Sequence, residues 1–164
     1  MPSLKRVICH WAVTKYKCDD NSQDHYHFIY EGDGTEVAGR FKPEDNLSTS
    51  DGTYAAHTLH SNAGSIGVSC AAMFGAVDVD HPGNFPITEK QFEAMCKGVA
   101  RLCKKYGIAV TDHTVLTHAE VQPVLGITQK GKWDISVLPH LKLKGVKACG
   151  DAIRASVSKH LTEI

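Results

Sequence analysis

The chain has 164 residues, and 18 Lys and Arg residues balance 18 Asp and Glu residues, so the formal net charge is zero at pH 7. This balance argues against nucleic acid as a partner, because binding through phosphates needs a basic surface. No apolar run approaches the roughly 18 residues that cross a bilayer, which argues against stable insertion into a membrane. The length is typical of one domain. We expect a single domain over residues 1–164 that acts as a monomer.

The first predicted element is a central strand. Residues 7–9 continue an apolar run that begins at Leu4, and the run stops at His10. Because residues 1–6 lead directly into this segment, we expect no signal peptide. The core of the domain is expected to extend from about residue 4 to about residue 140.

Three further strand-like segments follow. Residues 27–30 predict a second strand, and residues 35–39 predict a third that returns beside it, because Asp33-Gly34 is a strong hairpin signal. The polar residues 40–56 predict a surface loop. Residues 65–74 mix apolar and small side chains, which predicts a buried strand.

The clearest helix begins after Thr88. Gln91 stands three residues later, as in a capping box, and Gly107 is suited to the left-handed conformation that ends a helix. Apolar residues repeat between them with the helical period of 3.6 residues. They are Phe92, Met95, Cys96, Val99, Leu102, Cys103 and Tyr106. Residues 115–117 then predict a strand that ends at His118.

The carboxyl-terminal segment, from about residue 145 to about residue 161, predicts an amphipathic helix. Its apolar face consists of Val146, Cys149, Ile153, Val157 and Leu161. Strands that alternate with helices, together with one hairpin, predict an α/β domain with a central mixed β-sheet flanked by helices. In such folds the carboxyl ends of strands converge on one rim, where ligands bind.

Two histidines are predicted to lie on this rim. His10 and His118 each end a predicted strand, and neutral imidazole is a good zinc ligand. A catalytic zinc site uses three protein ligands and leaves one position open. A histidine at the end of a strand is, however, more often a hydrogen-bonded structural residue. The residues alone leave both interpretations open.

Five short segments occur in an order that is typical of one enzyme family. They are Val7-Ile8-Cys9-His10, Tyr26-His27-Phe28-Ile29, Asp33-Gly34-Thr35, His57 with Asn62 and Ser65-Ile66-Gly67-Val68, and Leu116-Thr117-His118. Together they resemble the zinc-dependent N-acetylmuramoyl-L-alanine amidases related to phage lysozyme-type amidases and peptidoglycan recognition proteins. The resemblance covers most of the chain, residues 7–134.

The resemblance implies a zinc ion and three ligands. His10 is the expected first ligand and His118 the second. The third ligand in this family is a Cys or Asp two residues after a Lys, and Asp134 follows Lys132 in this way. Family members commonly continue with Pro, whereas Ile stands there in this chain, so His140 stays open as an alternative third ligand. Zinc held by two imidazoles and a carboxylate lowers the pKa of a water ligand towards about 7.

The resemblance also implies two catalytic roles. Lys132 is expected to stabilise the oxyanion that develops during amide hydrolysis. Tyr26 is expected to position the attacking water or to help deprotonate it. Some relatives use a Glu shortly after the Ser-Ile-Gly segment instead, but residues 69–72 contain no carboxylate. The lack of a carboxylate in this segment favours Tyr26 as the residue that acts on the water.

Other polar residues receive simpler predictions. His57 and Asn62 match a family position that lines the substrate groove. Glu120 either accepts a hydrogen bond from the His118 imidazole or is a solvated loop charge. His27 is expected to pack within its strand or to support a ligand. The histidines expected at the surface are His25, His81, His113 and His160.

The cysteines raise a rival enzyme class. The six cysteines form no CxxC pair, and those on apolar periodic positions are expected to be reduced core thiols. A thiol peptidase needs a Cys that a nearby His activates. Cys9 and His10 are neighbours in a strand, so their side chains point to opposite faces. Cys96 and Cys103 lie on the apolar stripe of the predicted helix. Both observations disfavour a thiol peptidase.

The sequence therefore predicts a zinc amidase that cleaves the bond between N-acetylmuramic acid and L-alanine in peptidoglycan. We expect a phage endolysin, made in the host cytoplasm and acting on the cell wall in the periplasm. A cytoplasmic amidase that recycles muropeptides is the alternative biological role. The alternative biochemical role is a module that binds peptidoglycan without cutting it, because the resembled superfamily includes such proteins.

Overall fold

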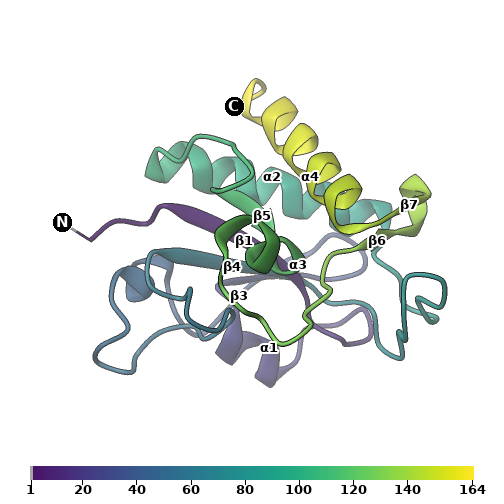
Figure 1. The fold of residues 1–164 in the computed structure, drawn as a ribbon, viewed down its shortest axis with the longest axis horizontal. Coiled ribbons are helices and arrows are strands. Elements are labelled where there is room, and N and C mark those ends of the chain that lie inside the picture. The colour runs from purple at the N-terminus through teal and green to yellow at the C-terminus, as the bar shows by residue number, and fades with distance from the viewer. Residues whose placement is uncertain (1) are drawn as a thin grey trace.

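The computed structural model describes residues 2–164. Its centre is a five-stranded sheet with the strand order β3-β2-β4-β1-β5 (Figure 1). β1 pairs in parallel with β4 and β5, β2 pairs in parallel with β4, and β3 pairs antiparallel with β2. The sheet is therefore mixed, and the predicted α/β fold class is confirmed. The strands are β1 (Arg6–Trp11), β2 (Phe28–Tyr30), β3 (Glu36–Ala38), β4 (Ser65–Cys70) and β5 (Val115–Thr117).

Helices cover the sheet on both sides. The two long helices, α2 (Glu89–Tyr106) and α4 (Val146–Leu161), contact each other and lie on one side of the sheet (Figure 1). The short helix α1 (Asp20–His25) lies on the opposite side. Within residues 2–164, the helices are all too short or too polar to cross a bilayer.

Helix α2 begins and ends where the sequence predicts. The Thr88 hydroxyl accepts a hydrogen bond from the Gln91 backbone N–H at 3.1 Å, and the Gln91 side chain accepts one from the Thr88 N–H at 2.9 Å. Gly107 ends the helix with a φ of 67°. The Gln91 amide also donates to the Tyr30 and Ala71 carbonyls at 3.0 and 3.1 Å. These hydrogen bonds of Gln91 hold the start of α2 against the ends of β2 and β4.

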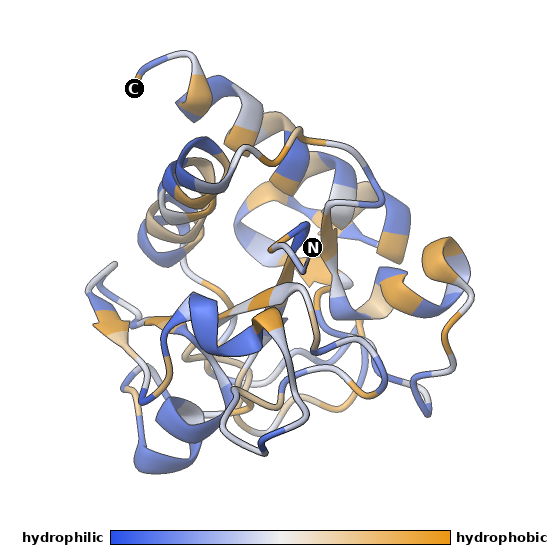
Figure 2. Ribbon diagram, turned by 90° about the vertical axis from the view of Figure 1, so that its left-hand side faces the viewer, coloured by the Kyte–Doolittle hydropathy of each residue, from blue (hydrophilic) through white to orange (hydrophobic). Residues whose placement is uncertain are grey.

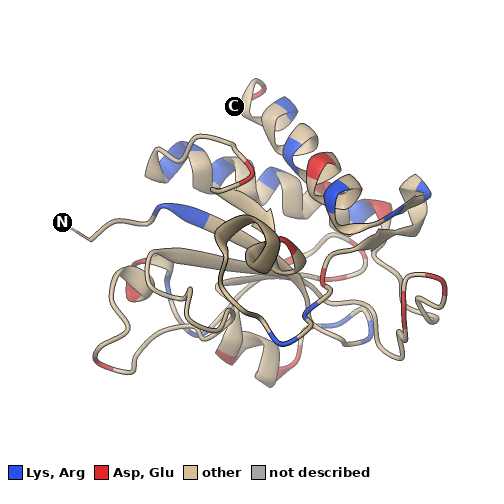
Figure 3. Cartoon of the chain, viewed as in Figure 1, with Lys and Arg blue, Asp and Glu red and all other residues tan. Residues whose placement is uncertain are grey.

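The core lies mainly between the sheet and the two long helices. One cluster of buried apolar residues extends from Leu4 to Val157, and both α2 and α4 show polar and apolar residues side by side (Figure 2). A smaller cluster of Ile8, Leu116 and Val121 packs on the other side of β1. All six cysteines are free and all but Cys18 are buried, as the apolar stripes predict. Charges of both signs are interspersed over the elements (Figure 3).

Short elements account for most differences from the prediction. They have too few residues for a periodic signal to be recognised. The predicted strand over residues 65–74 is too long, because β4 ends at Cys70 and Met73 has a left-handed φ of 71°. The further elements are the 3₁₀ turns η1 (Pro43–Leu47) and η3 (Pro139–Leu141), helix α3 (His118–Glu120), the π turn η2 (Val121–Leu125), and strands β6 (Val137–Leu138) and β7 (Leu143–Lys144).

Two polar residues lie deeper than the sequence predicts. His160, expected at the surface, is only 6% exposed, because α4 turns it towards α2, where its imidazole contacts the Glu93 carboxylate at 3.0 Å. Glu120 is neither a solvated charge nor the acceptor for the His118 imidazole, since it accepts two hydrogen bonds from Arg154, each 2.9 Å long. It also accepts one from the Thr117 N–H at 3.0 Å. The Glu120–Arg154 pair connects the turn after β5 to α4.

A substitution next to this ion pair tests its structural role. A Cβ added at Gly150 on α4 would overlap the Glu120 carboxylate, which Arg154 and Thr117 hold in place. Alanine gains about 1 kcal/mol of helix propensity over glycine, whereas overpacking beside a buried ion pair costs roughly 1–5 kcal/mol. We therefore expect Gly150→Ala to destabilise the protein by about 2–3 kcal/mol, measured by urea unfolding.

The matched control is Ser158→Ala, at an exposed position of the same helix. It is expected to change the free energy of unfolding by no more than about 0.5 kcal/mol. A Gly150→Ala variant as stable as the parent protein would show that Glu120 has room to move.

Candidate metal centre

Three predicted ligand residues lie together at the carboxyl end of the sheet. One ligand atom from each of His10, His118 and Asp134 lies within 4.8 Å of the others, and all three residues are buried. Oδ2 of Asp134 is 3.1 Å from Nδ1 of His10 and 3.5 Å from Nδ1 of His118. The alternative ligand His140 is not in this group and packs its ring against Phe92, with the ring centroids 5.0 Å apart.

The fold places these residues through two strands and one returning loop. Cys9 of β1 pairs with Thr117, the last residue of β5, so His10 and His118 each follow a member of this pair at the same edge of the sheet. The loop that carries Asp134 returns to this edge, where the Ala119 N–H donates a 2.6 Å hydrogen bond to the Asp134 carbonyl. The site is therefore assembled from contacts between residues far apart in the sequence.

Burial and neighbouring groups determine the charges at this site. Burial lowers the pKa of His10 to about 4, which keeps the imidazole neutral at pH 7. Burial acts to raise the pKa of Asp134, but contacts with His10 and His118 lower it overall, so Asp134 is a carboxylate. A neutral imidazole and a carboxylate are the protonation states that bind a metal ion.

His57 and Thr58 contact the nitrogen of His10 that faces away from Asp134. Nε2 of His57 is 3.2 Å from the Ser65 carbonyl, which only accepts, so this nitrogen is the donor and Nδ1 of neutral His57 is an acceptor. Nδ1 of His57 is 3.2 Å from Nε2 of His10 and 2.8 Å from the Thr58 hydroxyl, which itself lies 3.4 Å from Nε2 of His10. The other ring nitrogen of His10, Nδ1, faces Asp134.

This arrangement fits a bound cation. Nδ1 of His10 and Nδ1 of His118 both face one oxygen of Asp134, at 3.1 and 3.5 Å, so the three atoms surround a common point. Two imidazole nitrogens and one carboxylate oxygen form a donor set that suits zinc. Three protein ligands leave one coordination position for a further group.

Two of the three residues, His118 and Asp134, line a cavity of about 660 Å³. Tyr26, His57 and Lys132 contribute to its wall beside His118 and Asp134. The Tyr26 ring lies 5.1 Å from the His10 ring, measured between centroids, and burial, assisted by the Asp134 charge, raises the pKa of its hydroxyl. Lys132 is exposed to solvent on the loop that ends at Asp134. The structure thus brings both predicted catalytic residues to one cavity.

The two predicted groove residues lie in different places. His57 lines this cavity, but Asn62 lines a separate one. The Asn62 side-chain oxygen accepts hydrogen bonds from the backbone N–H groups of His57 and Thr58, both at 2.9 Å. Asn62 therefore shapes the loop that presents His57.

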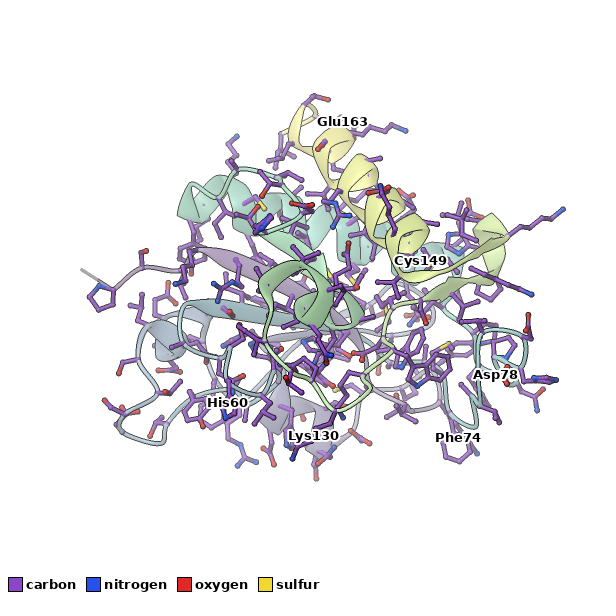
Figure 4. The ribbon with its side chains drawn as sticks, viewed as in Figure 1. His60, Phe74, Asp78, Lys130, Cys149 and Glu163 are labelled. Carbon is purple, nitrogen blue, oxygen red and sulfur yellow. The ribbon has the colours of Figure 1, made fainter. Side chains whose placement is uncertain are left out.

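Several residues of this cavity were not predicted as site residues. Gln129 is 2% exposed and contacts His118, and Trp133 packs edge-on against Trp11 with their ring centroids 4.7 Å apart. Figure 4 shows Lys130 at the turn of the same loop, which lies between η2 and β6. Trp133 could have been predicted as a site residue because it stands between Lys132 and Asp134 in the sequence, whereas no sequence pattern marks Gln129 in its polar loop.

His27 is buried behind the site and gives a pH prediction. Its Nδ1 accepts a hydrogen bond from the Gly67 N–H at 3.0 Å, and its Nε2 donates one to Asn46 at 2.9 Å. Burial lowers the pKa of His27 to about 4, against an ordinary value of 6.5. Because His27 is harder to protonate in the folded protein than in the unfolded chain, its contribution to the free energy of unfolding is complete above pH 6.5. This contribution is lost as the pH falls towards 4. The expected loss from this residue is about 3 kcal/mol in the free energy of unfolding.

Urea unfolding between pH 7 and pH 4 measures this effect. The His27→Gln variant, which lacks the titrating imidazole, is expected to lose about 3 kcal/mol less over this interval than the parent protein. His81→Gln, at an exposed histidine, is expected to follow the parent protein. Equal pH dependence of His27→Gln and the parent protein would refute the effect.

Known proteins resemble this chain in both sequence and fold. Residues 2–136 match the family described as Amidase_2, N-acetylmuramoyl-L-alanine amidase. No curated protein sequence matches the chain.

Three solved structures illustrate the likeness in fold. The amidase LysC from Clostridium intestinale is 16% identical, with a TM-score of 0.54 over 96% of this chain and 87% of LysC. The amidase AmiD from E. coli, in complex with an anhydro-muropeptide substrate, is 18% identical, with a TM-score of 0.56 over 81% of this chain and 52% of AmiD. The hydrolase AmiA from Staphylococcus aureus is 12% identical, with a TM-score of 0.61 over 98% of this chain and 74% of AmiA.

The family match covers most of the sequence, including His10, His118 and Asp134. The predicted resemblance is confirmed, and the chain belongs to the N-acetylmuramoyl-L-alanine amidase family.

Proposed function

We propose that the protein is a zinc-dependent amidase that hydrolyses the bond between N-acetylmuramic acid and L-alanine in peptidoglycan. His10, His118 and Asp134 would hold the zinc ion. The observation that carries the proposal is the convergence of their three ligand atoms within 4.8 Å, beside a cavity, in a chain of this family.

The side chains around the cavity have distinct proposed roles. A zinc ion held by His10, His118 and Asp134 would act as a Lewis acid, which would make a water molecule more acidic and would polarise the carbonyl of the scissile amide. Tyr26, half-buried with its ring 5.1 Å from the His10 ring, keeps its phenol hydrogen and orients the attacking water through it. Lys132 brings a positive charge to the cavity wall, where it stabilises the oxyanion. His57 lines the wall and, through Nδ1, holds His10 in orientation.

We propose further that the protein is an endolysin that acts on the intact wall in the periplasm, as a monomer. The alternative, a recycling amidase for soluble muropeptides, is favoured by the likeness in fold to AmiD, whose structure holds an anhydro-muropeptide substrate. The rates on purified sacculi and on soluble anhydro-muropeptides distinguish the two roles. An endolysin cleaves sacculi readily, whereas a recycling enzyme is active mainly on the soluble fragments.

The test of the activity is the release of new amino termini from purified sacculi. The proposed enzyme exposes the amino group of L-alanine, which chemical labelling detects, and EDTA stops the reaction until zinc is restored. His118→Ala serves as the inactive reference. A protein that binds sacculi but exposes no amino groups would be a binding module, and activity that survives thorough chelation would refute the role of zinc.

A further inference from the structure

Gln129 makes a set of buried contacts that the proposed catalytic roles do not use. Its side chain is 2% exposed, and its Oε1 is 2.7 Å from Nε2 of His118. Its Nε2 donates a 2.8 Å hydrogen bond to the Leu59 carbonyl, and its backbone N–H donates a 3.0 Å hydrogen bond to Oε1 of Gln122. Gln129 therefore connects the loop before Asp134 both to His118 and to the loop that follows His57.

These contacts determine the orientation of the Gln129 amide. The Leu59 carbonyl can only accept, so the nitrogen of the amide must face it and the oxygen must face His118. An amide oxygen also only accepts, so Nε2 of His118 must carry a hydrogen and donate it. In a neutral imidazole the other nitrogen is then bare. Nδ1 of His118, the nitrogen that faces Asp134 at 3.5 Å, is that bare nitrogen.

We propose that Gln129 is a positioning residue that holds His118 in the tautomer and ring orientation required of a metal ligand. This inference rests on the proposed zinc site. The buried hydrogen bond places the hydrogen of His118 on the side away from Asp134 before any metal binds. Partners of ligand imidazoles commonly change metal affinity by 10–100-fold when they are removed, because they orient the ring and raise its basicity.

Three variants separate this role from a merely structural one. Gln129→Met keeps the length of the side chain and removes the acceptor. Gln129→Glu keeps an acceptor for His118 but loses the donor to Leu59. Gln122→Ala, at an exposed residue, removes the partner of the Gln129 backbone and does not alter the contact with His118.

The first readout is zinc affinity, measured by competition with a chromophoric chelator. We expect Gln129→Met to bind zinc about 10–100-fold more weakly than the parent protein, with Gln129→Glu and Gln122→Ala within about fivefold of it. Equal losses in Gln129→Met and Gln129→Glu would assign Gln129 to the loop alone and overturn the proposal.

The second readout is the tautomer of His118 in the metal-free protein, observed by ¹H–¹⁵N correlation of the imidazole ring. The parent protein is expected to carry its hydrogen on Nε2, and Gln129→Met is expected to show a mixture of both tautomers. Unchanged tautomer and affinity in Gln129→Met would refute the proposal. A parent protein that shows the Nε2–H tautomer but binds no zinc would instead refute the proposed zinc site.

Discussion

Replacing Asp134 by alanine is expected to abolish zinc binding, whereas replacing His140 by alanine is expected to leave it intact. Asp134 supplies the oxygen that approaches both imidazoles, at 3.1 and 3.5 Å, and it is the carboxylate of the group. Its loss reduces the protein ligands from three to two and removes a negative charge opposite the cation. We expect zinc affinity to fall by more than about 100-fold, beyond the usual effect of losing a ligand's hydrogen-bond partner.

Elemental analysis of the dialysed proteins measures this effect directly. The His140 ring is packed against Phe92 and lies outside the ligand group, so His140→Ala is expected to retain the zinc content and the activity of the parent protein. Asp134→Ala is expected to lose both. The opposite pattern would make His140 the third ligand and would require a rearrangement of the loop that carries Asp134.

The Lys132→Ala variant is expected to keep its zinc and lose turnover. Lys132 lies on the cavity wall but outside the ligand group, so its removal leaves the metal donors unchanged. Removing one donor to an oxyanion typically reduces kcat by about 10²–10³-fold, and we expect a loss of this size on sacculi. KM is expected to change much less, because the oxyanion exists only in the transition state.

A lysine far from the cavity supplies the control for this experiment. Lys97, exposed on α2, is replaced by alanine with no expected effect on kcat. Lys132→Arg retains the positive charge and is expected to recover part of the turnover. Full activity in Lys132→Ala would remove Lys132 from the mechanism and leave the oxyanion to the metal.

Strong local patterns made part of this site predictable. Apolar runs that stop at His10 and His118 identified the two histidines as strand-end residues, and parallel pairing of β1 with β5 brings them together. Asp134 has no local pattern of its own. It was predicted only through its spacing from Lys132 in the family resemblance. Its position depends on long-range contacts, such as the hydrogen bond from the Ala119 N–H to the Asp134 carbonyl, which the local sequence does not predict.

Other residues depended on contacts that the sequence does not display. Glu120 is paired with Arg154 on the distant helix α4, and neither local sequence predicts the partner. Gln129 owes its proposed role to a loop that returns to His118 and Leu59. His160 was predicted at the surface because its packing depends on how α4 lies against α2. Long-range packing, and not local propensity, determined these positions.

The proposed chemistry depends on one zinc ion that binds between His10, His118 and Asp134. A crystal structure of the protein grown with zinc, with anomalous diffraction recorded on both sides of the zinc absorption edge, tests it most directly. We expect one strong zinc peak within bonding distance of Nδ1 of His10, Nδ1 of His118 and Oδ2 of Asp134. A peak coordinated by other residues, or no peak between these three, would contradict it.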